Sequence, residues 1–230
     1  MMGLNLTNNG SLRAAILGAN DGLVSNFILV MGVAGGSDNP KFALLAGIAG
    51  MLAGAFSMAT GEYISMRSQK DVYEHQIKQE TLHIKNFPQE TENTLVEIYQ
   101  TKGLSKEVSV TVARNIMDTP ETGLDTIVKE KLGLNPLQLG SPWGASISSF
   151  FSFSIGAIIP IAPYFFITDN LAVTLSSIFS ITALLIVGAT VALVSSKNVF
   201  WGAARMSIAG GSAAAVTFVI GGLIGTSIIG

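Results

Sequence analysis

The sequence contains no cysteine and few charged residues. The absence of cysteine excludes disulfides, thiolate metal ligands and cysteine nucleophiles within these 230 residues. Only 12% of the residues are charged, whereas about a quarter are charged in ordinary soluble domains. The net charge of −2 gives no basic surface for nucleic acid. The composition therefore favours a membrane protein over a soluble domain or a nucleic-acid-binding protein.

The charged residues that are present are concentrated in one central segment. Nine of the 13 Lys and Arg residues and 11 of the 15 acidic residues lie between residues 67 and 131. Five apolar segments flank it, each with the roughly 20 residues that a membrane-spanning helix needs. They cover residues 12–36, 41–66, 144–168, 170–195 and 200–229. We therefore predict an all-α polytopic membrane protein, with transmembrane helices in 1–66 and 143–230 and a helical insert in 67–142.

The basic residues outside the insert predict the orientation. With five spans, the N-terminus, the insert and the loop at 196–200 share one side, which carries Arg13 and Lys197. The opposite side carries Lys41 alone. Basic loop residues favour the cytoplasm. We expect a multi-pass protein of the inner, cytoplasmic membrane, with its N-terminus and insert in the cytoplasm and its C-terminus outside.

The insert is expected to consist of short helices. Residues 67–86 continue the second span up to Pro88, and helices at 89–101, 106–117 and about 120–133 follow. Their apolar residues can form one small core, made of Leu82, Leu95, Ile98, Val108, Val112, Ile116, Leu124, Ile127 and Val128.

The first predicted span contains a carboxylate, Asp21. Ionisable groups inside the membrane are costly and commonly functional. Asp21 lies about 15 Å along its helix, and no Lys or Arg lies at a similar depth. Such a group either takes up a proton or binds a cation, and Asn20, Ser25 and Asn26 place further oxygen atoms within two turns. The alternative is a neutral acid that forms a hydrogen bond with a neighbouring helix.

A second pattern lies near the end of the second span. Gly54, Met58 and Glu62 are spaced by four and share one helical face. A thioether beside a carboxylate suits Fe²⁺ better than Mg²⁺ or Ca²⁺. For Met58 the alternative is simple packing. The glycines at 47, 50 and 54, and at 221 and 225, form stripes that allow close helix contact, either within the chain or between two copies.

The insert contains acidic and histidine side chains that can bind metal. They are Glu74, His75, Glu80, His83, Glu90, Glu92 and Glu97. Glu80 and His83 have the Glu-x-x-His spacing of di-iron bundles, but only one copy of that motif is present, so a ferritin-like centre is not expected. A simpler cluster that collects Fe²⁺ or Mn²⁺ is one interpretation. The other is a solvated acidic face balanced by Lys70, Lys78 and Lys85.

Two long motifs resemble a known family. Residues 12–25, LRAAILGANDGLVS, resemble the opening of the vacuolar iron transporter family in its bacterial branch, and residues 53–65, AGAFSMATGEYIS, resemble its second span. The resemblance covers nearly the whole chain. It implies a homodimer of five-span protomers with a cytoplasmic metal-binding domain. It also implies export of Fe²⁺, and often Mn²⁺, in exchange for protons, without an organic cofactor.

The resemblance also implies roles for individual residues. Asp21 and Met58 match residues that line the path between the first spans of the two protomers, and Glu80, Glu97 and Glu130 match cytoplasmic glutamates. The chain departs from the family at Glu62, where plant members have glycine, and at His83, where a metal-binding glutamate is expected. The cytoplasmic site is therefore expected to differ in strength or selectivity.

The sequence thus predicts a proton-coupled exporter of divalent metal whose partners are membrane lipid, protons and a second copy of the chain. The transport pathway is predicted at Asp21, Ser25, Met58 and Glu62. The predicted metal ligands are Asp21, Met58, Glu62, Glu74, Glu80, His83, Glu92, Glu97 and Glu130. The alternatives are a membrane-bound sensor or storage module that binds metal without moving it, and a carrier of another solute. The sequence contains no nucleophile elbow, P-loop, dinucleotide fingerprint or zinc-protease motif, so it does not predict an enzyme.

Overall fold

The structure is a computed structural model that describes residues 10–133 and 140–228. Within these ranges the regular elements are all helical. They are α1 (Gly10–Gly36), α2 (Pro40–Asn86), α3 (Pro88–Thr101), α4 (Lys106–Met117), α5 (Pro120–Leu132), α6 (Pro142–Ile161), the 3₁₀ helix η2 (Ala162–Phe165), α7 (Leu171–Val194) and α8 (Val199–Ile228). Contacts divide the chain into two compact units, the first made of residues 1–64 and 140–230 and the second of residues 65–139.

The described residues include five helices that are long and apolar enough to cross a membrane. They are α1, α2, α6 with η2, α7 and α8. This confirms the predicted all-α polytopic fold. The observed helix bounds agree with the predicted spans to within two residues, apart from the ends of the second and third spans. As expected, α2 continues from the second span to Asn86 as one helix.

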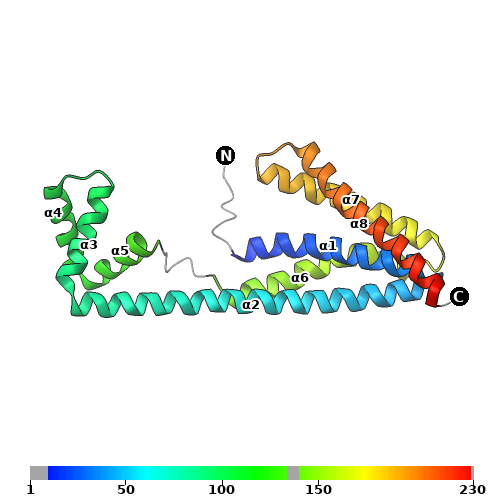
Figure 1. The fold of residues 1–230 in the computed structure, drawn as a ribbon, viewed down its shortest axis with the longest axis horizontal. Coiled ribbons are helices and arrows are strands. Elements are labelled where there is room, and N and C mark those ends of the chain that lie inside the picture. Colours follow the sequence, from blue (N-terminus) through cyan, green and yellow to red (C-terminus); the bar gives the residue numbers. More distant parts are fainter. Residues whose placement is uncertain (1–9, 134–139, 229–230) are drawn as a thin grey trace. The chain divides into compact units, whose positions relative to one another are not determined.

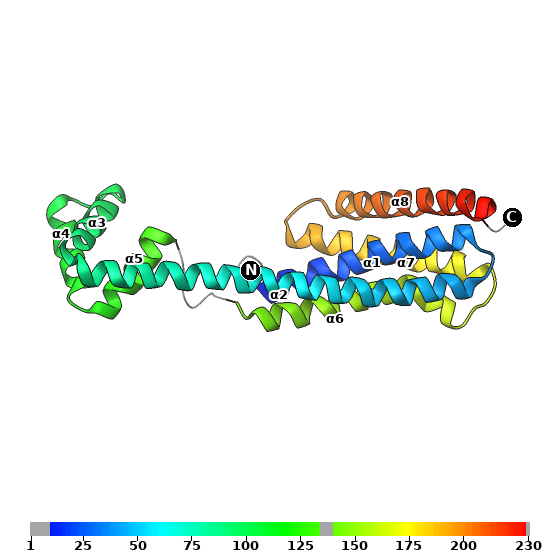
Figure 2. The same cartoon turned by 60° about the horizontal axis from the view of Figure 1, so that its bottom comes forward.

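Helix α1 is the centre of the first unit and contacts α6, α7 and α8 (Figures 1 and 2). Its side chains Leu23, Phe27 and Val30 are buried in a core that also includes Ile161 and Leu184. Large apolar side chains elsewhere point outward and stay exposed, as expected for helices surrounded by lipid.

Glycines allow the helices of this unit to touch through their backbones. A methyl group at Gly22 of α1 would overlap the carbonyl group of Phe153 in α6. The predicted stripes also pack within the chain: Gly221 faces the backbone carbonyl oxygen of Gly32, and Gly54 faces the side-chain ring of Phe153. Packing within one protomer therefore accounts for these glycine stripes.

The third span ends earlier than predicted. Helix α6 stops at Ile161 and continues as η2, whereas the sequence suggested one helix to residue 168. Pro163 has no amide hydrogen to continue the α-helical pattern, so it tightens the chain into the 3₁₀ turn. The carbonyl of Pro160, near the end of α6, accepts a hydrogen bond of 2.6 Å from Oγ of Ser176 in α7, which joins the two helices.

The second unit contains the short helices α3, α4 and α5. Ser105 caps α4, because its Oγ accepts a hydrogen bond from the Val108 amide. Helix α5 ends at Gly133, whose φ of 65° lies in the left-handed region that glycine adopts without strain. These caps set the bounds of helices that are too short to be stable alone.

The core of the second unit agrees with the prediction apart from two residues. Leu95, Ala113 and Ile127 are buried together, Val128 is buried as well, and all of these except Ala113 were expected in the core. By contrast, Val108 is 49% exposed and Leu82 is 46% exposed. Helix α4 buries Ser109 and Ala113 instead, because small side chains at this spacing allow it to pack closely against α3.

Candidate functional site

Four side chains of α1 form an exposed stripe, which we call the open face of α1. They are Leu17, Asp21, Ser25 and Leu29. Their spacing of four places them on one side of the helix. Gly22, Leu23 and Phe27, on other sides, are buried against the rest of the first unit. The carboxylate of Asp21 therefore lies on a membrane-spanning helix and is not covered by the part of the chain that the structure describes.

Ser25 lies one turn beyond Asp21 on the open face. Its Oγ donates a hydrogen bond of 2.5 Å to the backbone carbonyl of Asp21. This bond uses the hydroxyl hydrogen and leaves the oxygen lone pairs as acceptors. The open face thus offers a carboxylate and a hydroxyl oxygen, both of which are suitable ligands for a divalent cation.

Two asparagines near Asp21 face the interior of the first unit. Asn26 is 2% exposed, and its Nδ2 donates a hydrogen bond of 2.7 Å to the Ala157 carbonyl of α6. Its Oδ1, like that of Asn20, is buried and accepts no hydrogen bond from the residues that the structure describes. Unused acceptors of this kind are costly in an apolar interior. The bond to α6 fixes one side of the helix that carries Asp21.

Met58 and Glu62 lie one turn apart on α2, and both are half-buried. Met58 packs against the small cluster of Ala55, Phe153 and Ala157. Packing, the alternative considered for Met58, is thus observed, and its role as a thioether ligand stays a prediction.

Nowhere in residues 10–133 and 140–228 do three His, Asp or Glu side chains lie close enough to hold one metal ion. The ligands predicted in the insert therefore do not come together around one metal ion within a single protomer. Their role in binding metal stays a prediction.

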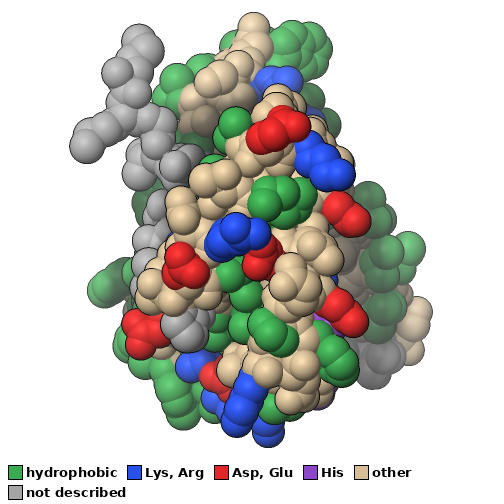
Figure 3. All heavy atoms as spheres, turned by 90° about the vertical axis from the view of Figure 1, so that its left-hand side faces the viewer, with side chains coloured by type: hydrophobic (Ala, Val, Ile, Leu, Met, Phe, Trp, Pro, Cys, Tyr) green, Lys and Arg blue, Asp and Glu red, His purple; other side chains and the backbone are tan. Residues whose placement is uncertain are grey.

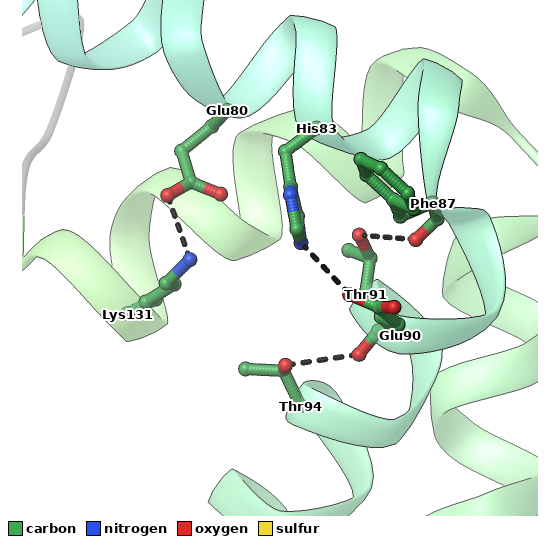
Figure 4. A network of polar contacts seen from close by, with 7 residues as sticks. All are labelled: Glu80, His83, Phe87, Glu90, Thr91, Thr94 and Lys131. Atoms are coloured by element: carbon green, nitrogen blue, oxygen red, sulfur yellow. Dashed lines mark hydrogen bonds and ion pairs between the residues drawn. The ribbon is translucent and has the colours of Figure 1, made fainter.

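Glu80 of α2 is paired with a lysine from α5. Its Oε1 lies 2.7 Å from Nζ of Lys131, and the Glu80 side chain is only 12% exposed (Figure 4). The second carboxylate oxygen is buried and has no hydrogen-bond partner among the described residues. Glu80 is thus held in place on one side and retains an unused acceptor on the other.

His83 lies one turn beyond Glu80 and faces α3. Its Nε2 is 4.0 Å from Oε2 of Glu90, and its ring centre is 5.4 Å from that of Phe87. Figure 4 shows Glu80 and His83 projecting from the same side of α2, one toward Lys131 and the other toward Glu90. An imidazole and a carboxylate at this distance are two potential ligands, fewer than a closed site needs.

Most other carboxylates predicted as ligands also lie beside a basic residue. Glu92 is 3.6 Å from Arg114, Glu74 is 3.7 Å from Lys70, and Glu130 is paired with Lys102. Glu97 is exposed. Figure 3 shows acidic and basic side chains interspersed on the face that it presents. Of the lysines expected to balance the acidic face, which are Lys70, Lys78 and Lys85, only Lys70 forms such a pair among the described residues.

The pair of Lys102 and Glu130 also affects Tyr99. Burial raises the pKa of the Tyr99 hydroxyl, the negative charge of Glu130 raises it further, and Lys102 opposes both effects. At the start of α4, hydrogen bonds from its own backbone amide and from the Ser105 hydroxyl lower the pKa of the Glu107 carboxyl. Glu107 therefore stays ionised at the positive end of the α4 dipole.

Sequence reasoning missed the partners that connect separate helices. Lys131 is 51 residues from Glu80, and Asn26 is 131 residues from Ala157. No periodicity or motif links residues at such separations, so only the folded chain reveals these contacts.

Comparison with known proteins gives consistent matches over most of the chain. The model of the VIT family matches residues 12–222, which include parts of both units. Vacuolar iron transporter homolog 1 of Arabidopsis thaliana is 35% identical over 216 residues, which cover 94% of this chain and 84% of that protein. The vacuolar iron transporter of Acanthamoeba castellanii is 32% identical over 213 residues, covering 92% and 78%. Vacuolar iron transporter 1 of Tulipa gesneriana is 29% identical over 210 residues, covering 91% and 85%.

Proposed function

The chain belongs to the VIT family, and on this premise we propose that it moves Fe²⁺, with Mn²⁺ as a second substrate, out of the cytoplasm in exchange for protons. The match confirms the resemblance inferred from residues 12–25 and 53–65. Members of this family are transporters and not enzymes, in agreement with the sequence prediction. The iron in the relatives' names supports a metal ion as the substrate.

The observation that carries the proposal is the position of Asp21 on the open face of α1. An ionised carboxylate in the middle of a membrane span costs about 3 kcal/mol on insertion scales, so it needs a proton or a cation to neutralise it. Proton and metal ion compete for the same oxygens. A carboxylate that releases metal on one side and a proton on the other therefore exchanges the two.

A second copy of the chain is the proposed cover for the open face. Leu17 and Leu29 at its ends are apolar, whereas Asp21 and Ser25 between them are polar. In a two-fold dimer the same face of each copy meets the other, so both Asp21 carboxylates would line one pathway. Met58 and Glu62 of α2 are proposed to receive the ion before it reaches Asp21.

The insert is proposed to lie in the cytoplasm and to collect metal there. Glu80, Glu92 and Glu130 each lie next to a lysine or arginine, so metal binding at these carboxylates requires displacement of a basic side chain. The exposed carboxylates of Glu74 and Glu97 and the imidazole of His83 supply further ligands. Because one protomer does not close a three-ligand group within its described residues, metal must rearrange these side chains or use a second copy.

Flux into inside-out vesicles tests this function. With an acidic lumen, the wild-type chain is expected to take up Fe²⁺ and Mn²⁺, and uptake is expected to stop when a protonophore collapses the pH gradient. Uptake at the same rate with and without the pH gradient would contradict proton coupling. Metal binding without any uptake would instead favour the storage or sensor alternative.

A further inference from the structure

A cavity of about 950 Å³ lies between α7 and α8, beside the loop that connects them. Lys197, Asn198, Trp201 and Arg205 line it together with apolar side chains such as Val191 and Ile208. This cavity is made by the first unit alone, and the proposed transport pathway does not use it.

The loop that carries Lys197 is held by backbone hydrogen bonds. Amides of Ser196 and Lys197 donate to the carbonyls of Leu193 and Ala192, which closes the end of α7. Ser196 adopts a φ of 53°, a left-handed conformation that non-glycine residues rarely take. Asn198 then caps α8, since its Oδ1 accepts a hydrogen bond from the Trp201 amide. Lys197 is thus fixed between two capped helix ends.

The two cations of the cavity have no acidic partner among residues 10–133 and 140–228. Lys197 and Arg205 are the only basic residues in 140–230, and Asp169, beyond the opposite end of α7, is the only acidic one. Neither cation forms an ion pair within the part of the chain that the structure describes. Arg205 lies more than one turn into a membrane-spanning helix, where an uncompensated charge is costly. An anion supplied from outside the chain would remove that cost.

The remaining lining identifies the kind of anion. Trp201 is 68% exposed beside the cations, and tryptophan is typical of the boundary between lipid and water. Val191 and Ile208 extend the cavity as an apolar wall along the two spans. A free phosphate ion needs no such wall, whereas the acyl chain of a lipid does. Basic pockets between membrane helices are known to bind phosphate-bearing lipid headgroups.

We propose that the cavity between α7 and α8 binds an anionic phospholipid. The headgroup phosphate lies between Lys197 and Arg205, where the guanidinium group can donate two hydrogen bonds to phosphate oxygens. One acyl chain follows Val191 and Ile208 along the span. The lipid neutralises two charges that the described residues leave unpaired and fixes the ends of α7 and α8 at the membrane boundary.

Native mass spectrometry of the full chain in non-ionic detergent tests this site with phosphatidylglycerol and phosphatidylcholine. The wild type is expected to bind phosphatidylglycerol selectively. At roughly 1 kcal/mol for each basic residue, the double variant Lys197→Ala/Arg205→Ala is expected to bind it about thirtyfold more weakly. The control Lys41→Ala/Lys106→Ala removes the same charge elsewhere and is expected to bind like the wild type. If the double variant does not fold, Arg205→Gln carries the test, with a loss of about fivefold.

Three results would overturn the proposal. The first is equal affinity for phosphatidylcholine and phosphatidylglycerol in the wild type. The second is an equal loss of binding in the control and in the Lys197→Ala/Arg205→Ala variant. The third is displacement of phosphatidylglycerol by inorganic phosphate at similar concentrations, which would mark a site for a soluble anion.

Discussion

Nζ of Lys131 lies 2.7 Å from Oε1 of Glu80, so a carboxylate that was predicted to bind metal is already paired with a lysine. The pair joins α2 to α5 within the second unit. Because the Glu80 side chain is 12% exposed, solvent screens this pair less than an ordinary surface ion pair. A metal ion that binds Glu80 must therefore compete with Lys131.

Replacing Lys131 by methionine is expected to strengthen metal binding. The substitution keeps the aliphatic part of the side chain and removes the competing charge. If the ion pair of Glu80 with Lys131 contributes about 1 kcal/mol, its loss should raise the affinity for Mn²⁺ about fivefold. Calorimetric titration of the full chain measures this change, and circular dichroism shows whether the helices remain folded.

Lys129→Met is the matched control for this prediction. Lys129 lies on the same helix and is paired with Asp125 at 2.5 Å, and neither residue is a predicted ligand. The control is expected to leave the affinity unchanged. If Lys131→Met binds Mn²⁺ no better than the control, Glu80 is a structural residue and not a metal ligand.

His83 is expected to tune which metals the insert prefers. Imidazole ligands favour Co²⁺ over Mn²⁺ more than carboxylate ligands do. His83→Ala should therefore weaken the binding of Co²⁺ about tenfold, which is typical of losing a residue that supports a metal site. The same substitution should weaken the binding of Mn²⁺ by a smaller factor. His75→Ala provides the control, since His75 is exposed on the same helix and forms no ion pair among the described residues. Equal effects of the two substitutions on Co²⁺ binding would show that His83 is not a ligand.

Gly22→Ala is expected to separate α1 from α6. The added methyl group would overlap the Phe153 backbone, which cannot rotate away as a side chain can. We expect a loss of about 3 kcal/mol or more, seen as a lower midpoint of thermal unfolding in detergent. Gly211→Ala is the control, because no atom outside its own stretch of helix lies within 4 Å of the added carbon and alanine favours a helix. A wild-type midpoint for Gly22→Ala would mean that the two helices are not in backbone contact.

Much of the fold was predictable because local patterns determine it. The apolar segments fixed the five spans, Ser105 marked the start of α4, and Gly133 marked the end of α5. The early end of α6 was missed, although Pro163 carried the signal for it. The exposure of Val108 was missed because apolar character alone does not show which side of α4 faces α3.

The candidate site was less predictable than the fold. The sequence identified Asp21 by its depth in a span, and the structure adds that its own protomer leaves it uncovered. The pairing of Glu80 with Lys131 depends on residues 51 positions apart, which only tertiary packing brings together. The same holds for the hydrogen bond between Asn26 and the Ala157 carbonyl.

The most direct test of the exchange mechanism is metal-driven proton flux through Asp21→Asn. The variant keeps the size of the side chain but cannot ionise, so it can neither carry a proton nor balance a cation. Asp38→Asn is the matched control, because Asp38 is an exposed carboxylate in the turn between α1 and α2. A pH-sensitive dye inside acid-loaded, inside-out vesicles reports the protons that leave when Fe²⁺ is added outside. We expect the wild type and Asp38→Asn to make the lumen more alkaline, while Asp21→Asn behaves like protein-free vesicles. Proton flux through Asp21→Asn at the wild-type rate would contradict metal–proton exchange at this carboxylate.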